Sequence, residues 1–328
     1  MKINLQKIIT PSIFTTAFTF LTAVGLWVFF YFVRPVTVSS VTNTLVFVER
    51  FIPLNSLWAY VVSLIVMLLT AILITQFNNK YAYINTRTFI HTFLFLMLST
   101  VFLLVHGNYP AYIAALLVLF ALYLFLGNYG NRNGTEVAFL GFIFLGTSFY
   151  FVPQYILLIP FVWIGFYQLK ALSGRVFFAS ILGAVVPTLA AFGIHYMKTG
   201  TFNYMPDFLI FINHFSFIYV QNIPALIFGI LFLIVFFILL VGMAASTHRE
   251  TIKTRKILFF FQTIAFGWAL LPVLFSVDLL SYLPLGIVFY AIFASYTFTN
   301  KRTFFYSVLF IILCIISAAF AVYQLLLY

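Results

Sequence analysis

The sequence predicts an all-α fold, a polytopic bundle of about eleven transmembrane helices, and two features of its composition carry this prediction. Of the 328 residues, 65% are hydrophobic and only 6% are charged, whereas a soluble domain carries roughly 25% charged residues. The mean hydropathy is +1.16. A water-soluble fold cannot bury that much apolar surface, so we interpret residues 1–328 as a single integral membrane domain whose main partner is the lipid bilayer.

Eleven apolar stretches are long enough, at about 18 to 22 residues, to cross the roughly 30 Å hydrocarbon layer of a bilayer. The first stretch exceeds the 7–15-residue apolar core of a signal peptide, so we expect it to be an uncleaved anchor. The predicted spans are residues 11–33, 57–77, 89–105, 111–129, 135–152, 155–172, 177–197, 225–245, 258–275, 279–299 and 304–328.

The net charge of +11 is explained by the positive-inside rule and does not call for a nucleic-acid partner. With the N-terminus in the cytoplasm and the C-terminus outside, 13 of the 16 Lys and Arg residues fall in inner connections. The inner cations are Lys2, Lys7, Lys80, Arg87, Arg132, Lys170, Arg175, Arg249, Lys253, Arg255, Lys256, Lys301 and Arg302, and the outer ones are Arg34, Arg50 and Lys198.

The remaining polar residues gather in connections assigned to the outer face, while the hydrocarbon depth holds essentially no ionisable group. Three of the five acidic residues of the chain lie there. Carboxylates able to act as a base, beside cations able to hold a phosphate, would suit sugar transfer from a polyprenyl phosphate carrier. The candidate catalytic residues are Glu49 and Asp207, and the candidate phosphate- or substrate-binding residues are Arg34, Arg50, Lys198, His106, His195, His214 and Asp278.

Each candidate also has a purely structural interpretation. Arg34 would anchor the first span in headgroups, Asp207 suits the first turn of a short interfacial helix after Pro206, and Asp278 would cap the helix that follows it. A second short interfacial segment is expected over residues 43–52. The stretch from His106 to Pro110 is typical of a turn.

No cofactor or metal is predicted. The sequence has no Walker loop, no HExxH or GxSxG motif and no His or Cys residues at metal-ligand spacing. Cys314 is the single cysteine, so a disulfide framework within the chain is excluded.

Two stretches, QFNNKYAYINTRTFIHTFLF (residues 76–95) and LGTSFYFVPQYILLIPFVWIGFYQLKALSGRVFFASILGAVVP (residues 145–187), resemble an uncharacterised family of bacterial multi-pass inner-membrane proteins. The likeness covers roughly residues 70–190. It implies a location in the bacterial inner, or cytoplasmic, membrane, and it brings no established activity.

The architecture is also similar to the GT-C superfamily of glycosyltransferases, which share the inner N-terminus, the many spans and an important first outer loop. This resemblance implies that Glu49 is the acidic residue of that loop and that a polyprenyl-phosphate-linked sugar is the donor. The chain departs from the superfamily at Arg34-Pro35, where those enzymes usually place their acid, and it is shorter than most of them.

Three functional hypotheses follow. The first is an enzyme of cell-envelope glycan assembly, acting on a lipid-linked sugar at the outer leaflet. The second is a transporter or lipid flippase, and the third is a non-catalytic subunit of a membrane complex. Neither the protein partners nor the oligomeric state can be read from the sequence.

Overall fold

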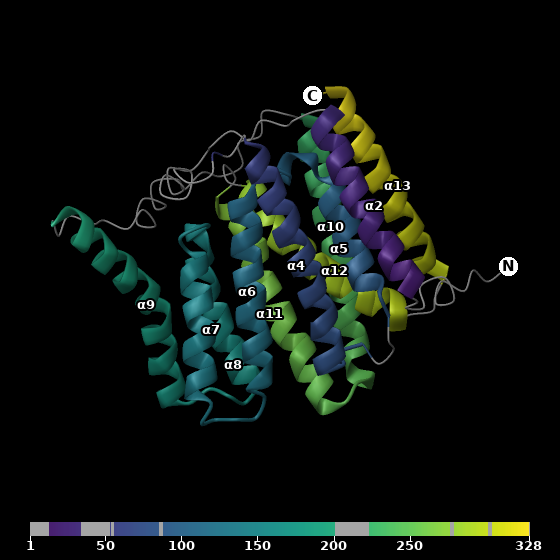
Figure 1. Ribbon diagram of the computed structural model, residues 1–328. Coiled ribbons are helices and arrows are strands. Elements are labelled where there is room, and N and C mark those ends of the chain that lie inside the picture. Colours follow the sequence, from purple (N-terminus) through teal and green to yellow (C-terminus); the bar gives the residue numbers. More distant parts are fainter. Residues whose placement is uncertain are drawn as a thin grey trace.

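The computed structural model describes residues 13–33, 53, 56–84, 88–200, 223–275, 279–300 and 304–327. Within these residues every regular element is helical, and eleven α-helices form one bundle (Figure 1). Each α-helix coincides with one of the eleven apolar segments. The helices are α2 (Ile13–Val33), α4 (Leu57–Tyr81), α5 (Ile90–Val101), α6 (Tyr109–Gly127), α7 (Thr135–Ser148), α8 (Leu158–Gln168), α9 (Gly174–Thr199), α10 (Ile223–Ser246), α11 (Ile252–Leu274), α12 (Leu279–Asn300) and α13 (Phe304–Leu327).

Seven of these helices are long and apolar enough to cross a membrane, namely α2, α4, α6, α9, α11, α12 and α13. Among the other four, α5 and α8 are shorter because each is interrupted near one end. α5 stops at Val101, and a 3-10 turn, η2 (Leu103–Val105), continues its path, while α8 is preceded by η3 (Pro153–Leu157). The chain is therefore a multi-pass helical membrane protein by length and composition, and the count of eleven crossings and the direction of the termini stay predictions.

Polar residues start several helices by accepting hydrogen bonds from backbone N–H groups that have no partner inside the helix. Ser56 accepts from the N–H of Ala59 at the start of α4, Asn108 from Ala111 at the start of α6, and Ser173 from Val176 at the start of α9. These caps mark where α4, α6 and α9 begin.

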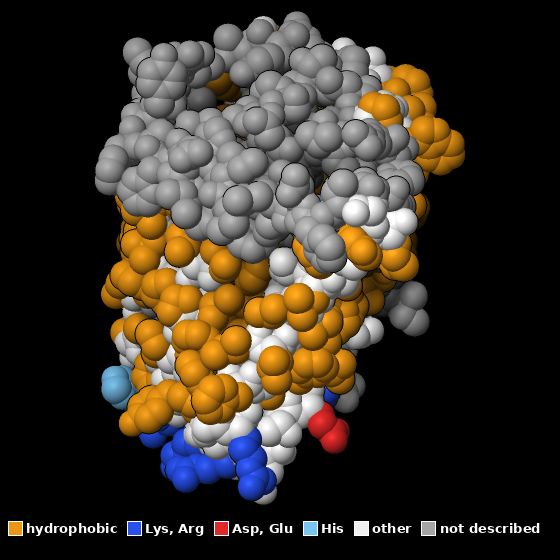
Figure 2. Space-filling model, turned by 90° about the vertical axis from the view of Figure 1, so that its left-hand side faces the viewer, with side chains coloured by type: hydrophobic (Ala, Val, Ile, Leu, Met, Phe, Trp, Pro, Cys, Tyr) orange, Lys and Arg blue, Asp and Glu red, His pale blue; other side chains and the backbone are white. Residues whose placement is uncertain are grey.

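The helix α12 forms the centre of the bundle, and α5, α6, α10, α11 and α13 pack around it. Its residues from Leu285 to Tyr296 are almost all buried. By contrast, α2, α9 and α13 lie at the periphery and expose large apolar side chains such as Phe14, Leu182 and Ile315. Apolar side chains form a broad belt on the surface seen in Figure 2, as expected of helices whose outer faces contact lipid.

The helix α9 is held to the bundle mainly by α7. Two glycines allow this close packing, because Gly183 lies against the carbonyl oxygen of Phe139 and Gly146 against that of Ala184. Beyond Pro187, a residue that bends helices, α9 leans away from its neighbours toward Thr199 (Figure 1). Close helix contact through small residues is common in membranes, since it lets the two backbones approach.

The bundle has two ends, and the described Lys and Arg side chains lie at one of them, which we call the basic end. Seven Lys and Arg side chains lie within the described part of the chain, all at the ends or connections of α4, α6–α7, α8–α9 and α10–α11. These ends lie together at the bottom of Figure 1, and blue side chains gather at the bottom of the face shown in Figure 2. The seven are Lys80, Arg132, Lys170, Arg175, Lys253, Arg255 and Lys256.

Candidate functional site

Most of the candidate site residues lie outside the described residues. This holds for Arg34, Glu49, Arg50, Asp207, His214 and Asp278, and also for the expected interfacial segments at 43–52 and after Pro206. Lys198 belongs to the final turn of α9, but its side chain is likewise outside the description. Whether these residues converge on one site therefore stays a prediction.

His106 is one of two candidate residues whose side chains the structure describes, and it lies inside the bundle rather than on its surface. It is 1% exposed and occupies the turn between η2 and α6. Its Nε2–H donates to the carbonyl oxygens of Ser99 (3.2 Å) and Thr100 (3.0 Å). Because carbonyls only accept, Nε2 must carry the hydrogen.

These two carbonyls belong to the last turn of α5, whose carbonyl groups lack the partners that a longer helix would supply. His106 therefore acts as a side-chain cap for the end of α5. Its own carbonyl accepts a hydrogen bond of 2.7 Å from Ser63 Oγ, which ties the turn to α4. The predicted turn from His106 to Pro110 is present, and it also starts α6 through Asn108.

An aromatic residue of the first helix covers the His106 ring. Trp27 stacks on it with a centroid separation of 3.7 Å and an interplanar angle of 15°. Phe30 contacts the same ring from the side at 6.0 Å, and Tyr112 of α6 meets Trp27 edge-on at 6.0 Å. His106 is thus a point at which α2, α4, α5 and α6 are joined.

Burial lowers the pKa of His106 to about 3, and the two carbonyl hydrogen bonds only partly oppose this shift. The ring is neutral at physiological pH. A neutral, enclosed imidazole whose N–H is already shared between two carbonyls is suited to holding helices together, and it carries no charge to attract a phosphate.

Several buried polar atoms near this turn have no hydrogen-bond partner within the described residues. They include Trp27 Nε1 and Ser99 Oγ, and the Tyr112 hydroxyl lies beside Ser99 without a bond of good geometry. Sequence reasoning missed these three residues because each stands within a long apolar segment. Buried Trp N–H and Tyr O–H groups usually have a partner, but no sequence signal marks which apolar segment brings them together.

His195, the other described candidate, lies on the last turns of α9 and is half-buried. It is on a different helix from the group around His106, and α9 leans away from the bundle at that point (Figure 1). The structure does not bring His195 and His106 together.

A second buried histidine, His91, lies in the first turn of α5. It is 1% exposed, and neither ring nitrogen has a hydrogen-bond partner within the described residues. At the end of α8, Gln168 Nε2 donates to Thr263 Oγ1 at 2.8 Å, which joins α8 to α11. In the described ranges no group of three or more His, Cys, Asp or Glu side chains is arranged to hold a metal ion.

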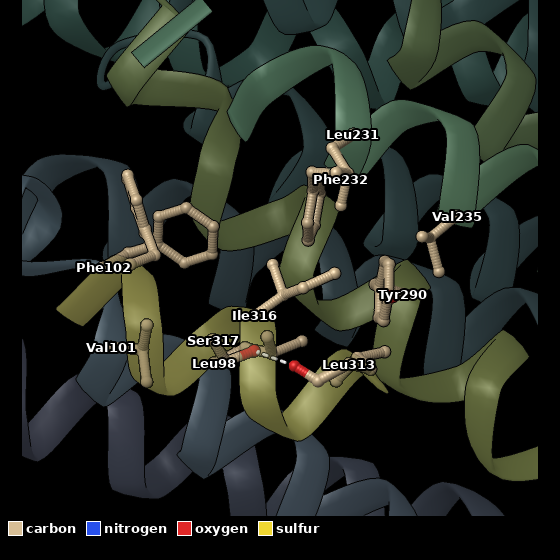
Figure 3. A pocket seen from close by; sticks show the side chains of 11 residues that line it. Leu98, Val101, Phe102, Leu231, Phe232, Val235, Tyr290, Leu313, Ile316 and Ser317 are labelled. Atoms are coloured by element: carbon tan, nitrogen blue, oxygen red, sulfur yellow. Dashed lines mark hydrogen bonds between the residues drawn. The ribbon is translucent and has the colours of Figure 1, made fainter. Parts of the chain in front are cut away.

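An apolar pocket lies between α5, α10, α12 and α13 (Figure 3). Aromatic rings line it, with Phe232 stacked on Tyr290 at 4.7 Å and edge-on to Phe102 at 5.6 Å. The hydroxyl of Ser317 also faces the pocket and donates to the carbonyl of Leu313 at 2.7 Å. Its lining contains no charged side chain, so it offers no acid, base or phosphate ligand.

At the basic end, Glu250 joins the turn between α10 and α11 to the end of α12. Its Oε1 accepts hydrogen bonds from the Tyr296 hydroxyl (3.0 Å) and from Asn300 Nδ2 (3.2 Å), both near the end of α12. Glu250 therefore holds the turn between α10 and α11 against the central helix.

Comparison with known proteins adds no relative to this description, since no family model, curated protein or solved structure matches the chain.

Proposed function

We propose that this chain is a multi-pass protein of the bacterial inner membrane that acts in cell-envelope glycan assembly, transferring a sugar from a polyprenyl phosphate carrier at the outer leaflet. Seven helices long and apolar enough to cross a membrane support the location. On the face shown in Figure 2, an apolar belt lies next to the basic end. This is the surface pattern expected of a membrane protein whose Lys- and Arg-rich loops stay in the cytoplasm.

One observation carries the choice of the outer leaflet. The two long connections, residues 34–55 and 200–222, leave from helix ends that lie opposite the basic end (Figure 1). Near the first connection, the rings of Tyr31 in α2 and Tyr60 in α4 meet edge-on at 4.9 Å, so the two helices are together there. The helix ends that flank the connections carrying Glu49 and Asp207 therefore lie at the same end of the bundle, away from the seven described cations.

The proposed reaction needs one base and one cationic site. Glu49 or Asp207 would take the proton of the acceptor hydroxyl as its oxygen attacks the anomeric carbon. The bond from that carbon to the carrier phosphate breaks, and the phosphate leaves with the bonding electron pair. Arg34, Arg50 or Lys198 would stabilise the charge that develops on it. The proposal gives no step to His106, whose ring is enclosed and neutral.

The test measures sugar transfer by the purified protein in nanodiscs. The protein is given a panel of polyprenyl-phosphate sugars in which the sugar is labelled. We expect donor consumption and a loss of at least about 100-fold in rate for Glu49→Gln or Asp207→Asn, the usual size of a general-base contribution. Glu136→Gln is the matched control, because Glu136 is an exposed carboxylate at the basic end, and it should retain full rate.

An intact donor across the whole panel would overturn the proposal, as would full transfer by both the Glu49→Gln and Asp207→Asn variants. Uptake of labelled lipid or solute into liposomes without chemical change would favour the transporter instead. Stable co-purification with other envelope proteins, with no effect of either substitution in cells, would favour the non-catalytic subunit.

A further inference from the structure

We propose that Arg132, Lys170 and Arg175 form a binding site for the headgroup of an anionic membrane phospholipid, and we call these three residues the basic platform. All three are exposed. Arg132 lies in the turn between α6 and α7, and Lys170 and Arg175 lie at the turn between α8 and α9. The proposal does not depend on the glycosyl transfer proposed above.

The two turns of the basic platform are joined to each other. The backbone N–H of Gly130 donates to the carbonyl of Leu169 at 3.0 Å, and Ser173 Oγ donates to the carbonyl of Arg132 at 2.8 Å. The two backbone turns that carry the three cations are thereby held together on one surface. A site whose backbone is already in place loses less entropy when a ligand binds to it.

The backbone at Lys170 is held in place most firmly. Its neighbours Leu169 and Ala171 are fully buried, and the N–H of Ala171 donates to the carbonyl of Phe166 at 3.0 Å. Lys170 itself has a φ of +56°, a left-handed conformation in which glycine is strongly preferred at the end of a helix. A lysine at this position costs backbone free energy, which points to a use for its charge.

The surroundings favour an anion. Both α7 and α9 begin here, so the positive ends of two helix dipoles add to the three cations. Within the described residues none of the three cations is in an ion pair. Glu136 in the first turn of α7 is the acidic residue of this surface, which leaves an excess of positive charge.

The position of the basic platform relative to the bilayer favours a lipid headgroup as the anion that it binds. The apolar belt of the bundle adjoins the basic end on the face seen in Figure 2. Tyr167, one turn before Lys170, is 75% exposed, and exposed tyrosines are typical of the headgroup level. A lipid phosphate at this level would meet the basic platform directly, and each Lys or Arg near an anionic surface strengthens binding by about fivefold.

The experiment compares lipid binding by purified protein in native mass spectrometry, with phosphatidylglycerol and phosphatidylcholine offered at equal concentration. We expect the wild-type protein to retain phosphatidylglycerol preferentially. The combined variant Arg132→Gln, Lys170→Gln, Arg175→Gln should lose about 100-fold in this preference, at fivefold for each cation. The matched control carries Lys253→Gln, Arg255→Gln and Lys256→Gln, which change the charge by the same amount at the same end of the bundle. This control should keep the preference for phosphatidylglycerol.

A single variant separates binding from folding. Lys170→Gly removes the charge and places the preferred residue in the left-handed position, so its unfolding temperature should equal or exceed that of the wild type while the lipid preference falls about fivefold. Equal losses in the platform variant and in the control variant would overturn the proposal, because binding would then follow total charge. Displacement of the lipid by millimolar inorganic phosphate would also overturn it, by assigning the site to free phosphate.

Discussion

Replacing Gly183 by alanine is expected to separate α9 from α7 and to destabilise the purified protein by about 1–3 kcal/mol, the usual cost of inserting a carbon into a packed contact. The new methyl group would come too close to the carbonyl oxygen of Phe139 and within 3.0 Å of Cβ of Phe142. A backbone carbonyl inside a helix cannot turn aside as a flexible side chain can. The helix α9 must therefore move, and α7 is its main attachment to the bundle.

Thermal unfolding in detergent micelles measures this effect, and Gly193→Ala is the matched control. Gly193 lies on the same helix, and nothing lies within 4 Å of a methyl group placed there. Since alanine favours a helix by about 0.5–1 kcal/mol relative to glycine, this variant should be as stable as the wild type or slightly more so. An unchanged unfolding temperature for Gly183→Ala would show that α9 does not pack on α7 as described.

His106→Leu is expected to be at least as disruptive. It removes the side-chain N–H that donates to the carbonyls of Ser99 and Thr100, and each buried acceptor left unpaired costs about 1–3 kcal/mol. The stack with Trp27 is lost as well. A loss of about 2–5 kcal/mol follows, whereas His248→Leu, at an exposed histidine of the basic end, should change the stability by no more than about 0.5 kcal/mol.

The same residue gives the stability a dependence on pH. In the folded protein the pKa of His106 is lowered to about 3 from the ordinary value of 6.5. Between these two values the unfolded chain binds a proton that the folded protein does not bind. The contribution of His106 is therefore favourable above pH 6.5 and is lost progressively as the pH falls toward 3. Unfolding temperatures recorded across this range should fall more steeply for the wild type than for His106→Leu, and parallel curves would contradict the buried, neutral histidine.

The positions of the helices could be predicted from the sequence because lipid imposes a simple rule on apolar length. Each of the eleven predicted segments contains a helix, and the start of α4 at Leu57 coincides with the predicted one. The ends were harder to predict. α4 continues to Tyr81 because Phe77, Asn78 and Tyr81 still bury their side chains, whereas α5 stops at Val101, well before the predicted end at residue 105. Hydropathy does not register either effect, since both depend on neighbouring helices.

The described part of the site could be predicted only in outline. The sequence predicts a turn at His106, which is present, and it assigns 13 cations to the inner connections. The seven of these whose side chains are described lie at one end of the bundle, and their cytoplasmic location stays a prediction. The enclosure of His106 under Trp27 was not predictable, because it is a contact between helices more than 70 residues apart. The left-handed Lys170 was also missed, since a lysine after a helix normally indicates only a favourable interaction with the dipole.

The central claim is that this chain crosses a membrane with its basic end in the cytoplasm and Glu49 on the outside. Thiol labelling in intact cells tests it most directly, with single cysteines introduced as Glu49→Cys or Lys253→Cys in a Cys314→Ser background. The account predicts that a membrane-impermeant maleimide labels Glu49→Cys in intact cells and Lys253→Cys only after the membrane is opened. Labelling of Lys253→Cys in intact cells, with Glu49→Cys protected, would contradict it.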